Sequence, residues 1–159
     1  MPKSELRSFR DLESWQRAME LAVACYRFAQ RLPRHEQFGL ASQLRRAAVS
    51  VPSNIAEGYG RRARGDYLRA LSIARGSLME VETQLSLAHL LEYGNAQEWE
   101  PVMILAQRTG ALLNAHIRSL GGRARDRPAG NSRLAPDSRS PAPPSHRHEP
   151  RHNGIDGTS

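Results

Sequence analysis

The sequence predicts an all-α protein: an antiparallel up-and-down four-helix bundle over residues 9–120. Apolar residues in this part recur at steps of three and four, the spacing of one face of a helix. No stretch alternates apolar and polar residues convincingly, as a half-buried strand would. Prolines and glycines divide the pattern into four long segments with short connections, and such segments pack best as an antiparallel bundle.

The first predicted helix begins near Leu12 and is stopped by Pro33, and it carries two apolar rows. The row that we expect in the core comprises Leu12, Trp15, Met19, Ala22, Tyr26 and Ala29. The second row comprises Leu21, Cys25, Phe28 and Leu32. Because the interior of a bundle needs one stripe per helix, the second row predicts subunit contacts, with a wider core face as the alternative.

The second predicted helix opens near Glu36 and is interrupted by Pro52. Its apolar row comprises Leu40, Leu44, Ala47, Val51 and Ile55. Proline lacks a backbone donor and crowds the carbonyl four residues earlier, so we expect a kink, or a restart capped by Ser50 or Val51.

The third predicted helix has the most regular spacing and is expected to stop at Gly94. Its row follows a heptad pattern and comprises Tyr67, Leu71, Ala74, Leu78, Val81, Leu85, Ala88 and Glu92.

The fourth predicted helix starts with a capping-box pattern formed by Asn95 and Glu98. Pro101 fits this start poorly, so we expect an irregular first turn or a start nearer Glu100. The apolar face comprises Trp99, Val102, Ala106, Gly110, Leu113, Ile117 and Leu120.

Composition changes at Gly121-Gly122, where we expect the bundle to end. Residues 121–159 hold six of the ten prolines and five of the 12 glycines, which predicts a disordered Arg/Pro/Gly/Ser-rich tail. Residues 1–8 are expected to form a flexible N-terminus. A metal site in the tail is the alternative to solvated side chains for His146, His148 and His152.

The chain is expected to be a soluble cytoplasmic protein with no membrane segment. Its 159 residues predict one domain, and its single cysteine excludes an internal disulfide. Residues 1–10 lack the apolar region of a signal peptide. The longest apolar runs are far shorter than the roughly 20 residues needed to cross a bilayer.

Positive charge is concentrated in the middle of the chain, although the whole carries a net charge of +7. Residues 45–75 contain seven arginines and two acidic residues, whereas residues 76–120 contain two arginines and five acidic residues. Arginine outnumbers lysine 22 to 1, which a GC-rich gene would also explain. Guanidinium groups bind phosphate bidentately and stack on bases, so the pattern predicts a polyanion as ligand.

The predicted nucleic-acid-binding residues surround the junction of the second and third helices. They are Arg45, Arg46, Arg61, Arg62, Arg64 and Arg69. Tyr59 and Tyr67 lie nearby and are candidates for stacking on unpaired bases, although Tyr67 falls on the core row. In the alternative, the arginines pair with acidic residues of a neighbouring subunit, namely Glu80, Glu82, Glu98 and Glu100.

Polar stripes on the second and third helices predict a structural network or a subunit interface rather than a catalytic site. Its expected members are Ser50, Asn54, Glu57, Arg75 and Glu80. If Asn54 and Glu57 are buried they need partners such as Arg75 or Arg46. The pair Gly76-Ser77 predicts a close approach between helices.

No residue pattern predicts an enzyme, a metal site or a cofactor. A di-iron bundle needs Glu-x-x-His pairs on its helices, and none occurs in the predicted helices of residues 9–120. Gly58, Gly60 and Gly65 fit neither the dinucleotide-binding nor the P-loop spacing. The single histidines at positions 35, 89 and 116 are expected at the surface or at an interface.

Residues 44–58, LRRAAVSVPSNIAEG, resemble the signature of the four-helix bundle proteins known as 23S ribosomal RNA intervening-sequence proteins. Supporting blocks are FRDL at 9–12, FGL at 38–40, ARGS at 74–77 and EVET at 80–83. The resemblance covers about residues 9–120 and leaves out the tail.

This resemblance implies an antiparallel four-helix bundle that associates into a ring-shaped homopentamer. Some members are encoded within 23S ribosomal RNA genes, and a related branch serves diversity-generating retroelements by partnering a reverse transcriptase and binding nucleic acid. We therefore expect a non-enzymatic oligomer that binds RNA electrostatically. The alternative is a scaffold for a protein partner, such as a reverse transcriptase, whose charges serve assembly.

Overall fold

The computed structural model describes residues 7–122, and this part of the chain consists of helices and short connections without a strand. The predicted tail disorder and nearly all of the predicted flexible N-terminus lie outside the described residues. The helices, preceded by a short 3₁₀ turn at Phe9–Asp11, are α1 (Glu13–Ala29), α2 (Leu40–Gly60), α3 (Arg64–Leu90) and α4 (Ala96–Gly122). The predicted all-α fold is therefore confirmed.

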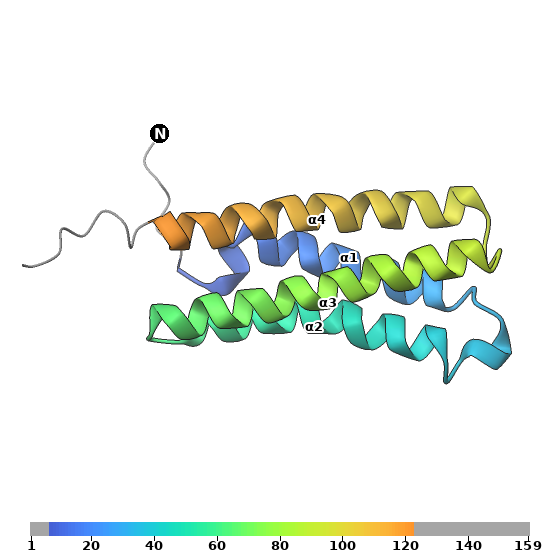
Figure 1. Ribbon diagram of the computed structural model, residues 1–159, viewed down its shortest axis with the longest axis horizontal. Helices are drawn as coiled ribbons and strands as arrows, with labels where there is room; N and C mark the ends of the chain where they lie inside the picture. The colour runs from blue at the N-terminus through green and yellow to red at the C-terminus, as the bar shows by residue number, and fades with distance from the viewer. Residues whose placement is uncertain (1–6, 123–159) are drawn as a thin grey trace, which may run out of the picture. The chain divides into compact units, whose positions relative to one another are not determined.

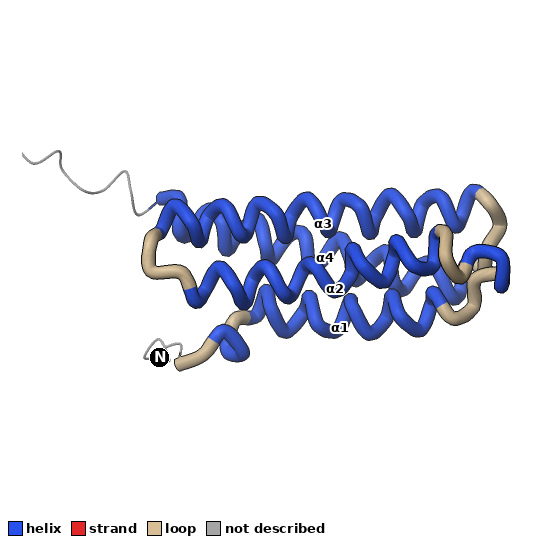
Figure 2. The backbone as a smooth tube through the Cα atoms, turned by 90° about the horizontal axis from the view of Figure 1, so that it is seen from below, coloured by secondary structure: helices blue, strands red, loops and turns tan. Residues whose placement is uncertain are grey.

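The four helices run alongside one another in alternating directions (Figure 1). Each packs on two neighbours, in the order α1, α2, α3 and α4, and α4 closes the bundle against α1. The connection between α2 and α3 lies at one end, and the other two connections lie at the opposite end (Figure 2). None of the described helices is apolar enough along its length to span a bilayer.

Both apolar rows of the first predicted helix contribute to the core, as the alternative of a wider core face predicted, and Leu12, Ala22 and Ala29 of the first row are buried. Leu21, Cys25, Phe28 and Leu32 are buried in the core, so their assignment to subunit contacts is wrong. Met19 and Tyr26, expected in the core, are 39% and 42% exposed. The more strongly apolar row faces the other helices because its burial removes more apolar surface from water.

Helix α2 begins at Leu40, four residues after the predicted start at Glu36. Glu36 lies in a separate 3₁₀ turn, and its carboxylate accepts a hydrogen bond of 2.8 Å from the backbone N–H of Leu40. This bond satisfies one of the free donors at the start of the helix. The predicted apolar row is confirmed from Leu44 to Ile55.

The predicted helix restart at Pro52 does not occur, because α2 is continuous from Leu40 to Gly60. Proline removes the hydrogen bond to the carbonyl of Ala48, but nearby side chains bond to the backbone. Ser53 Oγ donates to the carbonyl of Val49 at 2.8 Å, and Asn54 Nδ2 donates to that of Ser50 at 2.8 Å.

Helix α3 has the predicted core row, with Leu71, Val81 and Leu85 completely buried. It ends before Gly94, because Glu92 takes the left-handed conformation at a φ of 57°. The N–H of Tyr93 then donates to the carbonyl of Ala88 at 2.8 Å, which closes a Schellman motif.

The predicted capping box at the start of α4 is confirmed. The N–H of Glu98 donates to Asn95 Oδ1 at 3.0 Å, and the N–H of Asn95 donates to Glu98 Oε2 at 3.3 Å. The helix therefore begins at Ala96 and contains Pro101, so a start nearer Glu100 is wrong.

The close approach of α2 and α3 occurs at Gly58 and not at Gly76. A Cβ on Gly58 would lie 2.6 Å from the Tyr67 ring and 3.0 Å from the Ala70 side chain. A Cβ on Gly76 would meet nothing within 4 Å. Only the neighbouring Ser77 of the predicted pair lies in the interface.

Candidate nucleic-acid interface

The six predicted RNA-binding arginines form two separate groups. Arg45 and Arg46 lie in the second turn of α2, whereas Arg61 directly follows its last residue. A continuous helix rises about 1.5 Å per residue, so about 22 Å separates the backbone at Arg46 from that at Arg61. The expectation that all six surround the α2–α3 junction is therefore wrong for Arg45 and Arg46.

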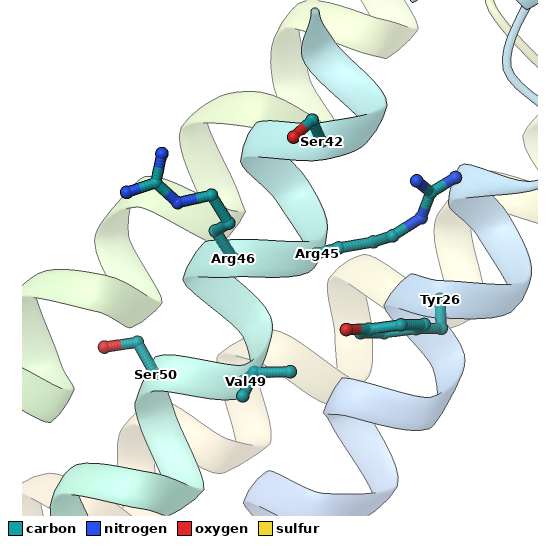
Figure 3. Close-up of a pocket in the computed structure, with 6 residues that line it drawn as sticks. All are labelled: Tyr26, Ser42, Arg45, Arg46, Val49 and Ser50. Carbon is teal, nitrogen blue, oxygen red and sulfur yellow. The ribbon is translucent and has the colours of Figure 1, made fainter. Parts of the chain in front are cut away.

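The first group lines an open groove of about 430 Å³ between α1 and α2 (Figure 3). We call it the Tyr26 groove; its lining residues are Tyr26, Ser42, Arg45, Arg46, Val49 and Ser50. The side chain of Arg45 extends toward α1 and Tyr26, whereas that of Arg46 extends to the other side of α2 (Figure 3). Neither guanidinium forms an ion pair with a residue in the range 7–122.

The second group lies at the α2–α3 junction, and two of its four arginines have partners within the chain. Arg61 pairs with Glu57 one turn earlier, and this contact raises the pKa of Arg61. Arg64 Nη2 donates to the carbonyl of Gly121 at 2.9 Å and so links the start of α3 to the end of α4. Arg62 and Arg69 are exposed and pair with no acidic residue in the described part of the chain.

The two groups also differ in local charge. A depression of about 340 Å³ at the junction contains Glu57 and Asp66 together with Arg61 and Arg69, so its charged side chains balance. The Tyr26 groove contains two arginines and no acidic lining residue. An anion therefore meets a more favourable potential in the Tyr26 groove.

The predicted polar network exists in part, at the α2–α3 interface. Ser50 Oγ lies 2.8 Å from Ser77 Oγ, and Asn54 Nδ2 donates to Ser50 Oγ at 2.9 Å. Ser77 is buried and was not among the expected members. These side chains satisfy one another, as buried polar groups must.

The other three expected members of the network lie apart from this cluster. Glu57 is exposed and pairs with Arg61 rather than with Arg46 or Arg75. Arg75 and Glu80 are exposed on α3, and neither forms a hydrogen bond or ion pair with a described residue.

The two tyrosines predicted to stack on bases are occupied within the bundle. Tyr59 and Tyr67 contact each other edge to face, with ring centroids 6.5 Å apart. Tyr67 also contacts the ring of His116, and burial raises the pKa of Tyr67 to about 12. Both rings are only partly accessible, so they present little free surface to a base.

His116 joins three helices, a role that the sequence pattern did not predict. Its Nδ1 lies 2.9 Å from Ser14 Oγ of α1, and its Nε2 lies 2.9 Å from the Tyr67 hydroxyl of α3. Burial lowers the pKa of His116, so the neutral ring donates through one nitrogen and accepts through the other. A Ser–His pair can activate a nucleophile, but Ser14 is only 5% exposed and therefore cannot reach a substrate.

Of the acidic residues predicted to pair with arginines of a neighbouring subunit, Glu98 is engaged within the chain. Glu98 pairs with Arg31 and also caps α4. Within residues 7–122, no group of three or more His, Cys, Asp or Glu side chains is placed to hold a metal ion. The three histidines of the tail lie outside the described residues.

Tyr26 is the groove residue that sequence reasoning missed as a candidate for binding. The sequence pattern predicts a core position for Tyr26 because it continues the row of Leu12 and Ala22. The stronger apolar character of the row containing Leu21 and Phe28 was the available signal, because it identifies that row as the core and places Tyr26 toward the surface.

Comparison with known proteins identifies a family and a similar fold. The family model described as 23S rRNA-intervening sequence protein matches residues 10–115. The chain also resembles a crystal structure from Bacteroides thetaiotaomicron VPI-5482, described as a protein with unknown function from the S23 ribosomal protein family. That similarity has a TM-score of 0.62 at 24% identity and covers 66% of this chain and 95% of the other. No curated protein matches.

Proposed function

This chain belongs to the 23S rRNA-intervening sequence protein family, and we propose that it is a non-enzymatic protein that binds RNA through arginines of α2 and the α2–α3 junction. The observation that carries this proposal concerns four guanidinium groups. Arg45, Arg46, Arg62 and Arg69 have no acidic partner among the described residues. Such groups are available for bidentate contacts with phosphate.

RNA is the polyanion that we favour because the family is described by its connection with 23S ribosomal RNA. Binding of this kind neutralises phosphates and releases counterions, so affinity falls steeply with salt and depends little on sequence.

We further propose that the chain acts as a ring-forming homopentamer. A groove of about 770 Å³ between α3 and α4 supports a contact between copies, because its lining includes the exposed side chains Met79, Leu87 and Leu90. Exposed apolar patches of this kind mark interaction sites. The number five follows from the resemblance to the family, and repetition of the arginine groups around a ring would add avidity for RNA.

The same apolar groove favours a second candidate function, a scaffold for a protein partner such as a reverse transcriptase. In that case the arginines would serve assembly and not RNA binding. Charge reversal at Arg62 and Arg69 would then break the oligomer, which light scattering would detect.

The test of the main proposal is a titration of RNA with the full chain at several salt concentrations, followed by fluorescence anisotropy. We expect binding at about 50 mM salt and a steep loss at about 200 mM. Combined replacement of Arg62 and Arg69 by Ala should weaken binding and reduce the salt slope. The matched control replaces Arg108 and Arg118, two exposed arginines of α4, by Ala.

Two results would contradict the proposal that these arginines bind RNA. One is the absence of any complex at the lowest salt concentration. The other is an equal loss of affinity in the control variant, which would show that net charge alone, and not the α2–α3 arginines, controls binding. Leu87→Glu places a charge in the apolar groove between α3 and α4 and is the reference for a loss of assembly. Light scattering of each arginine variant, compared with this reference, separates a loss of assembly from a loss of RNA contacts.

A further inference from the structure

Tyr26 is the most exposed of the four tyrosines in the described part of the chain. It is 42% exposed, and its ring makes no aromatic contact with a described residue. Tyr93, by contrast, contacts His35 and Glu36, and Tyr67 contacts His116. The Tyr26 ring is therefore partly open to solvent in a groove whose lining also includes two arginines.

The groove combines the two groups that bind an unpaired nucleotide. An aromatic face stacks on any base, and guanidinium groups bind the phosphates on either side of it. Arg45 extends toward α1 and Tyr26, whereas Arg46 extends to the other side of α2 (Figure 3). The volume of about 430 Å³ lies within the range of small-ligand sites.

The serines of the groove differ in their availability. The Ser50 hydroxyl is engaged with Ser77 and Asn54. The Ser42 hydroxyl makes no hydrogen bond with a residue in the described range and is free for a ribose or phosphate oxygen.

We propose that the Tyr26 groove binds an unpaired nucleotide of single-stranded RNA, with its base on Tyr26, an adjacent phosphate on Arg45 and a further phosphate of the strand on Arg46 across α2. This inference rests on the proposed RNA-binding function and adds a preference for single strands. Bases inside a duplex stack on each other and cannot reach Tyr26, so a duplex contacts the arginines alone.

The experiment compares two RNA probes bound by the full chain. One is a fluorescein-labelled oligoadenylate of about 12 nucleotides, and the other is a labelled duplex of the same length. Replacement of Tyr26 by Leu removes the aromatic face at an exposed position, and Tyr26→Phe is the matched control because it keeps the ring. Thermal unfolding of each variant verifies that the bundle remains folded.

We expect Tyr26→Leu to weaken binding of the oligoadenylate by roughly 10-fold and to leave duplex binding within about twofold. Tyr26→Phe should bind both probes like the wild type. Replacement of Arg45 and Arg46 by Ala should weaken both complexes, because each contains phosphates.

Three results would overturn this inference while the proposed function remains. They are unchanged oligoadenylate binding by Tyr26→Leu, an equal loss for both probes, and an equal loss in Tyr26→Phe. Failure of the wild-type protein to bind either probe would instead remove the proposed function together with the inference.

Discussion

The Tyr67 hydroxyl and His116 Nε2 lie 2.9 Å apart, and their hydrogen bond connects α3 to α4 inside the bundle. The opposite ring nitrogen of His116 lies 2.9 Å from Ser14 Oγ of α1. One side chain thus ties together three helices that are distant in sequence. Gly58 brings α2 to the same place, because its missing side chain leaves space for the Tyr67 ring.

The first prediction concerns pH. Burial lowers the pKa of His116 in the folded state, whereas the unfolded chain has the usual value of about 6.5. The unfolded state therefore binds more protons near about pH 6, and stability falls as pH decreases through the unfolded pKa. Urea unfolding at several pH values should show this loss, and His116→Gln should reduce it.

The matched control for this pH dependence is His35→Gln, because His35 is exposed. It should retain the pH dependence that His116 causes. If the free energy of unfolding of His116→Gln depends on pH as steeply as that of the wild type, His116 does not control stability near about pH 6.

The second prediction concerns the close approach of α2 and α3. Gly58→Ala should lower the free energy of unfolding by about 1–3 kcal/mol, because the added Cβ would lie 2.6 Å from the Tyr67 ring. The control is Gly76→Ala on α3, where the Cβ meets nothing within 4 Å. That variant should gain about 0.5–1 kcal/mol from helix propensity. Chemical unfolding that ranks the two variants in the reverse order would contradict this packing.

The third prediction concerns the end of α3. Glu92 has a φ of 57°, which costs a residue with a Cβ about 1 kcal/mol relative to glycine. Glu92→Gly should therefore raise the melting temperature. Glu80→Gly, at an exposed position inside α3, should lower it by removing a residue of better helix propensity. A lower melting temperature in both variants would show that the contacts of the Glu92 side chain stabilise the fold by more than its left-handed backbone conformation destabilises it.

The fourth prediction concerns the ion pair between Glu57 and Arg61. If the junction binds RNA, Glu57→Gln should increase affinity a few-fold at low salt, because it frees Arg61 and removes a negative charge. Anisotropy titrations with the same RNA measure this gain.

The control for that experiment is Glu20→Gln, which breaks the similar exposed pair of Glu20 with Arg17 on α1. The control should change affinity less than Glu57→Gln does. An equal increase in both variants would assign the effect to net charge rather than to the junction.

Much of the fold could be predicted because local patterns and packing agree. The heptad row from Leu71 to Ala88 faces the core, and the capping box of Asn95 and Glu98 forms as expected. The start of α2 near Glu36 and its continuity through Pro52 were harder to predict. They depend on side-chain bonds to backbone groups, which outweigh the ordinary preferences of proline and glutamate.

The candidate site was less predictable from the chain because spacing along a sequence does not give distance in space. Arg45 and Arg61 were grouped as one cluster, but an unbroken α2 holds them at separate places. Conversely, Tyr26 and Arg45 are 19 positions apart in the sequence and line the same groove.

By itself, the sequence determined that this protein is a bundle of four helices with arginines concentrated in its middle, because periodicity and charge are properties of the chain alone. Tertiary structure decided which residues of the two apolar rows of α1 are buried, which arginines remain unpaired and which tyrosine is open to a ligand. Those outcomes depend on how neighbouring helices share one core, and only the packed bundle brings together Tyr26 with Arg45 and Tyr67 with His116.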